Sequence, residues 1–426
     1  MSGLLQLGEA ATAGAIETVR FFNGRLLSGA DLTREQTARG NYDARLAQAM
    51  GSGIAHGLTV AQSASDRSEA SAAVTVSAGL GVTRSGQVLG LASDTRIALV
   101  RSDSSDFSSN QTCAFGDCTP VSPGTYVAGE GLYLLVAAPA SVSAGRAQVN
   151  GLQGDPLACN VDRDLGAVCF RLIEVPPHSY DNISPAQSDF RNRIAYRCFG
   201  RRAALPWVAQ LYGQADSGTT LLDELAASGL SDGDLPLALI HFTGALDVTF
   251  IDQWAVRRGI APADLAAPLA SMTQSARIAT GVAMLQQFQD QLASLAAPGG
   301  SLGAITAQSH FPTLPPLGLL PGFNEVGAKR FFGTMEVRGA KYIHAAQLEV
   351  LVRESLSAPA LNSADERVIW LYSVADAVIA QAPRLTEEGI RQPVLVFARG
   401  DLAYRGDAHF NLSHWNFANY ALAGGY

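Results

Sequence analysis

The residues with the clearest potential for chemistry lie at positions 229–233, where Gly-Leu-Ser-Asp-Gly matches the G-x-S-x-G pattern. In serine hydrolases this pattern places the nucleophilic Ser on a sharp turn that leads from a strand into a helix. Here a helix-like segment, LLDELAAS, precedes Ser231, and a strand-like segment, LPLALIHFTG, follows it. Because the order of the elements is reversed, we do not predict that Ser231 is a catalytic nucleophile.

Five cysteines could supply a disulfide or metal ligands. Cys113 and Cys118 flank four residues of a polar loop and are close enough for a disulfide that clips the loop. A zinc site would need a second Cys or His pair at suitable spacing, and the sequence has none. Cys159 and Cys169 could face each other across a hairpin, whereas Cys198 is expected to be a small buried side chain.

The remaining candidates are a histidine and three arginines. His241 lies within an apolar run without a second ligand at metal spacing, so we expect a core histidine whose hydrogen bonds are satisfied. Arg191, Arg193 and Arg197 flank a helix predicted over residues 184–199. They could bind an anion, but we expect a solvated or ion-paired face. The sequence therefore predicts no catalytic, cofactor-binding or metal site, and we expect no enzyme.

Composition favours a protein that contacts other proteins. Only 16% of the 426 residues are charged, against roughly a quarter in typical soluble domains, so weakly charged surface is available for assembly. The net charge of −8 and the absence of a basic run argue against nucleic acid and anionic membranes. No stretch approaches the roughly 20 apolar residues that cross a bilayer, and the start lacks a secretory signal. We therefore expect a homo-oligomer made in the cytoplasm, without membrane insertion.

The N-terminal segment predicts a short strand at residues 18–22, a Gly turn and a helix over residues 28–50. Ser28 and Asp31 have the spacing of a capping box at the start of this helix. Apolar residues then recur at helical spacing, and two glycines follow the end. These apolar residues are Leu32, Tyr42, Leu46, Ala49 and Met50.

Strand patterns dominate the next part of the chain. Residues 74–100 alternate apolar and polar positions between Gly turns, which predicts a β meander. Residues 101–130 are polar and predict a loop insertion. The apolar run at 131–140 predicts a central strand, and 168–177 predicts a strand that ends at a Pro pair. Residues 235–258 predict two further strands.

The last part mixes helices and strands. A helix with a buried apolar stripe is predicted within 263–297, an extended Pro-rich segment at 310–323, and a helix at 345–355. Strands are predicted at 368–379 and 393–400. Aromatic residues near the C-terminus are candidates for a docking surface. They are Phe410, Trp415, Phe417 and Tyr420.

The predicted fold class is α+β: a β-rich, multi-part protein with antiparallel β modules, an N-terminal capped helix and a central helical segment. Residues 1–180 form the predicted N-terminal β module, which includes the helix and the loop insertion. Residues 181–300 form a mixed strand and helix region, and residues 301–426 form a C-terminal α+β region.

Blocks in a common order resemble structural proteins associated with phage-tail-like, extracellular contractile injection systems and tail gene clusters. They are RFFNGRLLSGADLTREQ, GIAHGLTV with VTVSAGLGVTRSGQVL, VCFRLIEV, LPLALIHFTGALDVTFIDQWAVRR and FPTLPPLGLLPGF. The resemblance spans most of the chain from Val19 to about Tyr372 and carries no catalytic residues. In the usual pattern the first helix is longer and more basic, and the 101–130 loop is smaller. The outer face of this helix is therefore our preferred candidate for a particle-specific contact.

Three functional hypotheses follow. The first, implied by the resemblance, is a baseplate-linked, spike-enclosing or fibre-like protein that binds other copies and other tail or baseplate proteins. It would be assembled in the cytoplasm and become part of a released or extracellular particle. The second is an adhesin that binds carbohydrate or a cell surface through aromatic residues such as Trp415. The third is a hydrolase around Ser231. The position in the particle, copy number and disulfide state stay open.

Overall fold

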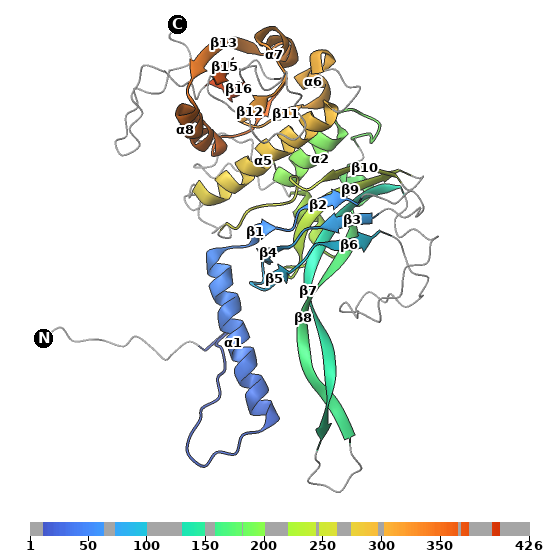
Figure 1. The fold of residues 1–426 in the computed structure, drawn as a ribbon, viewed down its shortest axis with the longest axis vertical. Helices are drawn as coiled ribbons and strands as arrows, with labels where there is room; N and C mark the ends of the chain where they lie inside the picture. The colour runs from blue at the N-terminus through green and yellow to red at the C-terminus, as the bar shows by residue number, and fades with distance from the viewer. Residues whose placement is uncertain are drawn as a thin grey trace, which may run out of the picture.

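The central element of the fold is a four-stranded antiparallel sheet in the order β10-β9-β7-β8 (Figure 1). Its strands are β7 (Gly131–Val149), β8 (Ala158–Glu174), β9 (Leu235–Thr243) and β10 (Asp247–Asp252). The structure is a computed structural model that describes residues 12–63, 73–99, 130–149, 158–180, 182–200, 220–243, 247–261, 274–296, 302–364, 368–374 and 394–400.

Strand β7 buries side chains on both faces of this sheet, as the continuous apolar run predicts. Its even-numbered residues lie in a core with helices α2 and α4, and its odd-numbered residues lie in a core with two smaller sheets. The first set is Leu132, Leu134 and Val136, and the second is Tyr133, Leu135 and Ala137. The helices are α2 (Phe190–Phe199) and α4 (Leu221–Ala226), and the 3-10 turn η1 (Pro177–Ser179) follows β8.

The strands predicted over residues 74–100 are present, but they do not form a simple meander. β3 pairs with β2 and β6, while β4 pairs with β1 and β5. The chain therefore changes sheet between β3 and β4, which alternation alone cannot reveal because it predicts strands and not their partners. The strands are β1 (Gly53–Gly57), β2 (Val60–Gln62), β3 (Ala73–Val76), β4 (Gly79–Val82), β5 (Val88–Leu91) and β6 (Thr95–Ala98).

A second mixed sheet, in the order β12-β16-β15-β13, organises the C-terminal part. β13 and β15 are parallel, and the other neighbours are antiparallel. The strands are β12 (Leu317–Leu320), β13 (Glu336–Ile343), β15 (Val368–Val374) and β16 (Val394–Arg399). A short pair, β11 (Thr313–Leu314) and β14 (Leu361–Asn362), lies beside it.

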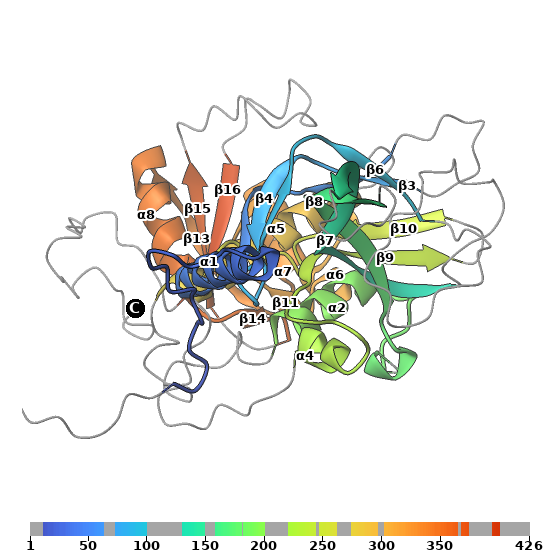
Figure 2. The same ribbon diagram turned by 90° about the horizontal axis from the view of Figure 1, so that it is seen from below.

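Helices cover this second sheet (Figure 2). Phe288 of the long helix α5 lies among aromatic rings, with its centroid 4.9 Å from that of Phe311 and 5.6 Å from that of Phe397. The predicted stripe of α5 is confirmed, since Leu285, Phe288 and Leu292 are buried and Leu295 packs partly buried against the core. The helices are α5 (Gln274–Leu295), η4 (Leu302–Ala304), α6 (Ala307–His310), α7 (Glu325–Phe332) and α8 (Ala345–Leu356).

A buried polar network joins the two sheet regions. The Arg191 guanidinium on α2 donates to Asp252 Oδ2 at the end of β10, with an Nε–Oδ2 distance of 2.9 Å, and also pairs with Asp290 on α5. Gln287 on α5 donates to the same Asp252 oxygen at 3.1 Å. Because these residues come from α2, β10 and α5, we call this network the joint. Attraction to Asp252 and Asp290 outweighs the burial penalty and raises the pKa of Arg191.

The central sheet draws its strands from two of the regions predicted from the sequence. β7 and β8 lie before residue 180, whereas β9 and β10 lie after it. The predicted boundary at residue 180 therefore falls between strands that hydrogen-bond within one sheet. The α+β, strand-rich class and its antiparallel sheets are confirmed.

Candidate interaction surface

Ser231 lies in a turn between α4 and β9, the order that argues against a nucleophile elbow. Its hydroxyl donates to Asp234 Oδ2 at 2.8 Å, and its backbone N–H donates to the same oxygen at 2.7 Å. Asp234 is buried and also forms an ion pair with Arg171. The hydroxyl of Ser231 therefore helps to fix the turn that starts β9.

His241 is a core residue, as predicted, but its predicted hydrogen bonding is not satisfied. The ring stacks on Phe250 with centroids 5.5 Å apart and contacts Phe190 edge to face at 5.3 Å. Within the described part of the chain, its Nδ1 atom has no hydrogen-bond partner. Burial among these rings lowers the pKa of His241, because the charged form loses its hydration.

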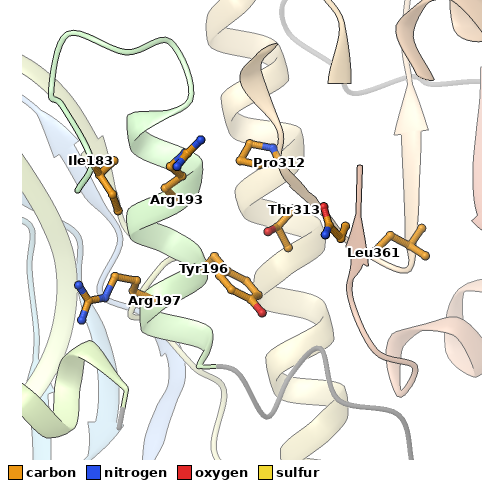
Figure 3. A pocket seen from close by; sticks show the side chains of 8 residues that line it. Ile183, Arg193, Tyr196, Arg197, Pro312, Thr313 and Leu361 are labelled. Atoms are coloured by element: carbon orange, nitrogen blue, oxygen red, sulfur yellow. The ribbon is translucent and has the colours of Figure 1, made fainter. Parts of the chain in front are cut away.

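The arginines of α2 are ion-paired rather than available to an anion. A cavity of about 370 Å³ lies between α2 and the β11–β14 pair (Figure 3). Arg193 and Arg197 line it, but their guanidinium groups pair with Asp189 at 2.6 Å and Glu224 at 2.7 Å. The predicted ion-paired face is confirmed, and we assign no anion site to this cavity.

The cysteines do not form the hairpin pair considered from the sequence. Cys159 and Cys169 lie on one strand, β8, ten residues and therefore about 33 Å apart, which no disulfide can span. Cys169 is disulfide-bonded. Cys198 is buried as predicted, and burial raises the pKa of its thiol to about 12. Cys113 and Cys118 lie outside the described residues.

Three further features concern metal ions, membranes and the C-terminal aromatic residues. Among the described residues, no group of three or more His, Cys, Asp or Glu side chains is placed to hold a metal ion. No helix in the same part of the chain is long and apolar enough to cross a membrane. The predicted aromatic docking surface, Phe410, Trp415, Phe417 and Tyr420, lies outside the described residues.

Two elements project from the same side of the molecule and stand apart from each other (Figure 1). The first is the helical leg, which we define as residues 12–50 and which contains α1 (Gly29–Met50). The predicted capping box is present: the Ser28 side chain accepts from the Asp31 backbone N–H, and the Asp31 carboxylate accepts from the Ser28 backbone N–H. At 1.5 Å per residue, α1 is about 33 Å long.

The predicted strand at residues 18–22 is absent, since this segment pairs with no strand in the structure. Residues 12–28 run alongside α1 instead, where Glu17 pairs with Arg34 at 3.5 Å and Arg45 donates to the Gly14 carbonyl. This segment covers one side of the helix and extends the leg to its distal turn.

Among the described residues, the contacts of α1 with the body lie at its C-terminal end. A turn at residues 83–86 approaches so closely that a Cβ atom on Gly86 would lie 2.1 Å from the Ala44 carbonyl oxygen. Gln48 also reaches the Arg84 carbonyl at 3.5 Å. Within α1 only Ala38 and Ala47 are buried, so the leg contributes little to any core of the chain.

The outer side of the helical leg is apolar and exposed. The side chains of Leu32, Tyr42, Leu46 and Met50 are 52%, 55%, 64% and 56% exposed. At 100° per residue they occupy an arc of about 80° on the helix. The helical spacing predicted from the sequence is therefore confirmed, but it marks a surface and not a core contact. Four more exposed apolar side chains lie at the distal end: Phe21, Phe22, Leu26 and Leu27.

The second projecting element is the ribbon, which we define as residues 138–149 of β7 and 158–168 of β8. β7 loses its partner β9 after Ala137, so among the residues that the structure describes the ribbon has two strands only. None of residues 138–147 and 161–166 is buried. An isolated two-stranded hairpin is marginally stable in water, so an element of this kind normally requires a further packed layer.

The two faces of the ribbon differ in polarity. Val142 pairs with Leu165, and Arg146 pairs with Val161, so these residues share one face. Ala144 and Arg163 form the pair between them. The opposite face is polar, and there the Ser143 hydroxyl donates to Asp164 Oδ1 at 2.8 Å. The ribbon is therefore amphipathic, with an apolar face that carries two arginines.

The ribbon was not predicted from the sequence, because the strands predicted on either side of it end at residue 140 and begin again at residue 168. A weak signal was present: SVSAGRAQV alternates small or apolar residues with polar ones over nine positions. Ala and Ser have low strand propensity, so this alternation is less distinct than the Val- and Leu-rich run that precedes it.

Comparisons with known proteins found similarity to solved structures only. No protein-family model matches the sequence, and no curated protein matches it. Among solved structures, the chain is similar to the crystal structure of TssK, with 13% identity and a TM-score of 0.24 over 67% of this chain. The chain spans about half the length of TssK, 51%. A TM-score of 0.24 does not establish a shared fold.

Proposed function

We propose that this protein is a structural, non-enzymatic component of a phage-tail-like contractile injection particle, and that it acts by self-association and by docking on other particle proteins. The observation that carries the proposal is the pair of projecting elements with exposed apolar faces. Contiguous exposed apolar surface of this kind marks protein–protein interaction sites.

Two further observations support this proposal. The low charged fraction of 16% provides weakly charged surface that can be buried against neighbours at little desolvation cost. The ordered sequence blocks resemble structural proteins of contractile injection systems. Two of these blocks are in contact, since Arg257 donates to the carbonyl oxygens of Gly57 and Leu58, at 2.7 Å for Leu58. They therefore act together as a scaffold for the β1–β2 turn.

The distal end of the helical leg is the candidate docking point for other particle proteins. Phe22 is 65% exposed and Leu26 is 92% exposed, on either side of the Asn23-Gly24 turn. This end lies one helix length, about 33 Å, from the anchored end of α1. It can therefore reach a neighbouring protein without contact between the two bodies.

The test is co-sedimentation with the particle. Particles would be collected by ultracentrifugation from cells that produce them, and the pellet examined for this chain beside sheath and tube proteins by quantitative mass spectrometry. We expect a fixed ratio of the chain to the sheath protein. The double variant Phe22→Glu/Leu26→Glu should reduce that ratio by about tenfold or more, since it places charges in the contact.

Val326→Glu is the matched control, because Val326 is 68% exposed on α7 and lies in the C-terminal part. We expect this variant to sediment with the particle as the wild type does. If the wild-type chain remained in the supernatant while sheath and tube proteins were pelleted, the proposed function would be wrong.

A further inference from the structure

We propose that the apolar side of α1 in one copy of this chain packs on the apolar face of the ribbon in a second copy. The inference rests on the self-association part of the proposed function. It specifies the partner, the two surfaces that meet and the symmetry of the contact.

The first argument concerns the face of the ribbon that lacks a cover. Even-numbered residues of β7 in the body, such as Leu134 and Val136, are covered by α2 and α4. The same face continues along β7 to Val142 and Ala144, because side chains two residues apart lie on one side of a strand. Leu165, opposite Val142, is 49% exposed, and Val161 is 52% exposed. The ribbon thus extends a helix-covered face to a region without a helix.

The second argument concerns size. The ribbon portion of β7, residues 138–149, is about 40 Å long at 3.3 Å per residue. The apolar stripe of α1 runs along a helix of about 33 Å. The one long helix of the described residues with an exposed apolar stripe therefore has the length of the face that lacks a helical cover.

The third argument is charge. The apolar face of the ribbon carries Arg146 and Arg163. On α1, Glu35 and Asp43 lie within or beside the stripe, about 60° and 20° from Leu32 on the helix. Arg39 also lies within the stripe, about 20° from Leu32, and pairs with Glu35 at 3.7 Å. The stripe of α1 therefore has a net negative charge, left by Asp43, and the ribbon face carries two arginines, which favours helix-on-ribbon packing over packing of two ribbons, which would bring the arginines together.

The cover comes from a second copy, because the two elements of one copy do not cover each other. They stand apart in the fold, and Leu46, Val161 and Leu165 all remain about half or more exposed (Figure 1). Each copy then offers a helix to one neighbour and a ribbon to another. A contact between two different surfaces is head-to-tail, and repetition of it closes a ring or extends a filament.

The experiment uses two single variants of the full chain, Leu46→Glu on the helix and Leu165→Glu on the ribbon. Molar mass would be measured by size-exclusion chromatography with light scattering across a range of concentrations. We expect an oligomer for the wild type, and for each variant an association weakened by at least about tenfold, because a charge enters the contact. Val326→Glu should associate as the wild type does. Circular dichroism and urea unfolding would verify that each variant is folded.

Mixing the variants tests the head-to-tail arrangement. Leu46→Glu retains an intact ribbon, and Leu165→Glu retains an intact helix, so a mixture can form one complete contact. We expect the equimolar mixture to yield a 1:1 dimer, while each variant alone is monomeric. A charge exchange provides a second check: Asp43→Arg should weaken association, and Arg163→Asp in the same chain should restore it.

Two results would overturn the inference. If Leu165→Glu kept the wild-type molar mass while Leu46→Glu dissociated, α1 would be pairing with something other than the ribbon. A monomeric wild type at every concentration would exclude the contact altogether. Co-sedimentation of the wild type with particles would still support docking in either case, so failure of this inference and failure of the proposed function are distinguishable.

Discussion

Charged and apolar side chains are placed in opposite ways at the joint and on the two projecting elements, the helical leg and the ribbon. At the joint, Arg191 is 11% exposed and its partner Asp252 is 1% exposed, so this ion pair is buried, while Asp290 at the edge of the joint is 44% exposed. On the helical leg and the ribbon, ion pairs lie at the surface and apolar side chains face solvent. The joint is formed by residues of one copy, whereas the helical leg and the ribbon have apolar side chains that no described residue of the same copy covers. Substitutions at the joint should therefore change the stability of the fold, whereas substitutions on the helical leg and the ribbon should change the association between molecules.

The largest expected loss of stability is at the joint. Arg191→Leu leaves the buried Asp252 carboxylate without its cation, and such a change costs about 3–5 kcal/mol. Urea unfolding would measure this loss. Arg193→Leu is the matched control on the same helix, because its ion pair with Asp189 is more exposed, at 43% for the arginine, and is expected to contribute about 1 kcal/mol or less. Equal losses for the two variants would contradict the assignment of the joint.

A smaller effect is expected from His241, next to the joint. Burial lowers its pKa in the folded protein below the ordinary value of 6.5, while nearby Glu130 partly opposes this shift. The folded state then binds fewer protons than the unfolded state, so stability is unaffected well above pH 6.5 and falls as the pH is lowered below it.

His241→Phe keeps an aromatic ring between Phe190 and Phe250 but removes the titrating group. We expect the thermal midpoint of the wild type to fall more between pH 7.5 and 5.5 than that of the variant. Parallel pH profiles would show that protonation of His241 does not oppose folding.

The smallest effect is expected at the capping box of the helical leg. Ser28→Ala removes a side-chain acceptor for a helical N–H and costs about 1 kcal/mol of local helix stability. Hydrogen exchange should become faster in the first turn of α1, with no change in the global urea midpoint. Thr33→Ala, one turn further along, serves as the control. A shift of the global midpoint would mean that the leg is coupled to the cores.

The stabilisation that this capping box gives to the start of α1 depends on pH. Hydrogen bonds from Ser28, and then from Arg25, lower the pKa of Asp31 to about 2. Its contribution is therefore fully present above the ordinary value of 3.8 and is lost as the pH falls towards 2. Exchange in the first turn of α1 should be insensitive to this carboxylate above pH 4.

Local patterns predicted most elements correctly, because strand and helix periods depend on neighbouring residues. The Ser28–Asp31 cap, the buried stripe of α5 and the central strand β7 are all of this kind. Pairing partners were not predictable, because β3 and β4 alternate equally well whether or not they share a sheet. Whether an apolar stripe faces a core or solvent was also not predictable. The apolar residues of α1 and α5 recur at similar helical spacing, yet Leu46 on α1 is 64% exposed and Leu292 on α5 is 1% exposed.

The candidate surface could be predicted only in part. The outer face of the first helix was predicted as a contact because the helix departs from the proteins that the sequence blocks resemble, and its exposed apolar stripe is consistent with that prediction. The ribbon was missed because Ala, Ser and Gly in residues 141–147 have weak strand propensity, so that hydrogen bonding to β8 rather than local preference determines their conformation. The joint was missed because Asp252 and Asp290 are distant from Arg191 in the sequence.

The backbone angles of two glycines at the base of α1 determine where the distal end of the helical leg lies. Gly51 and Gly53 adopt φ values of 110° and 139°, and a Cβ atom on Gly53 would lie 2.6 Å from the Gly259 carbonyl oxygen. These contacts fix the base of the helix against the body, so the backbone angles at the two glycines set the direction of the helix. On an arm of about 33 Å, a rotation of about 10° at these glycines moves the distal end by about 6 Å. A small change in backbone angle at the base is thereby amplified into a displacement comparable to one turn of a helix at Phe22 and Leu26.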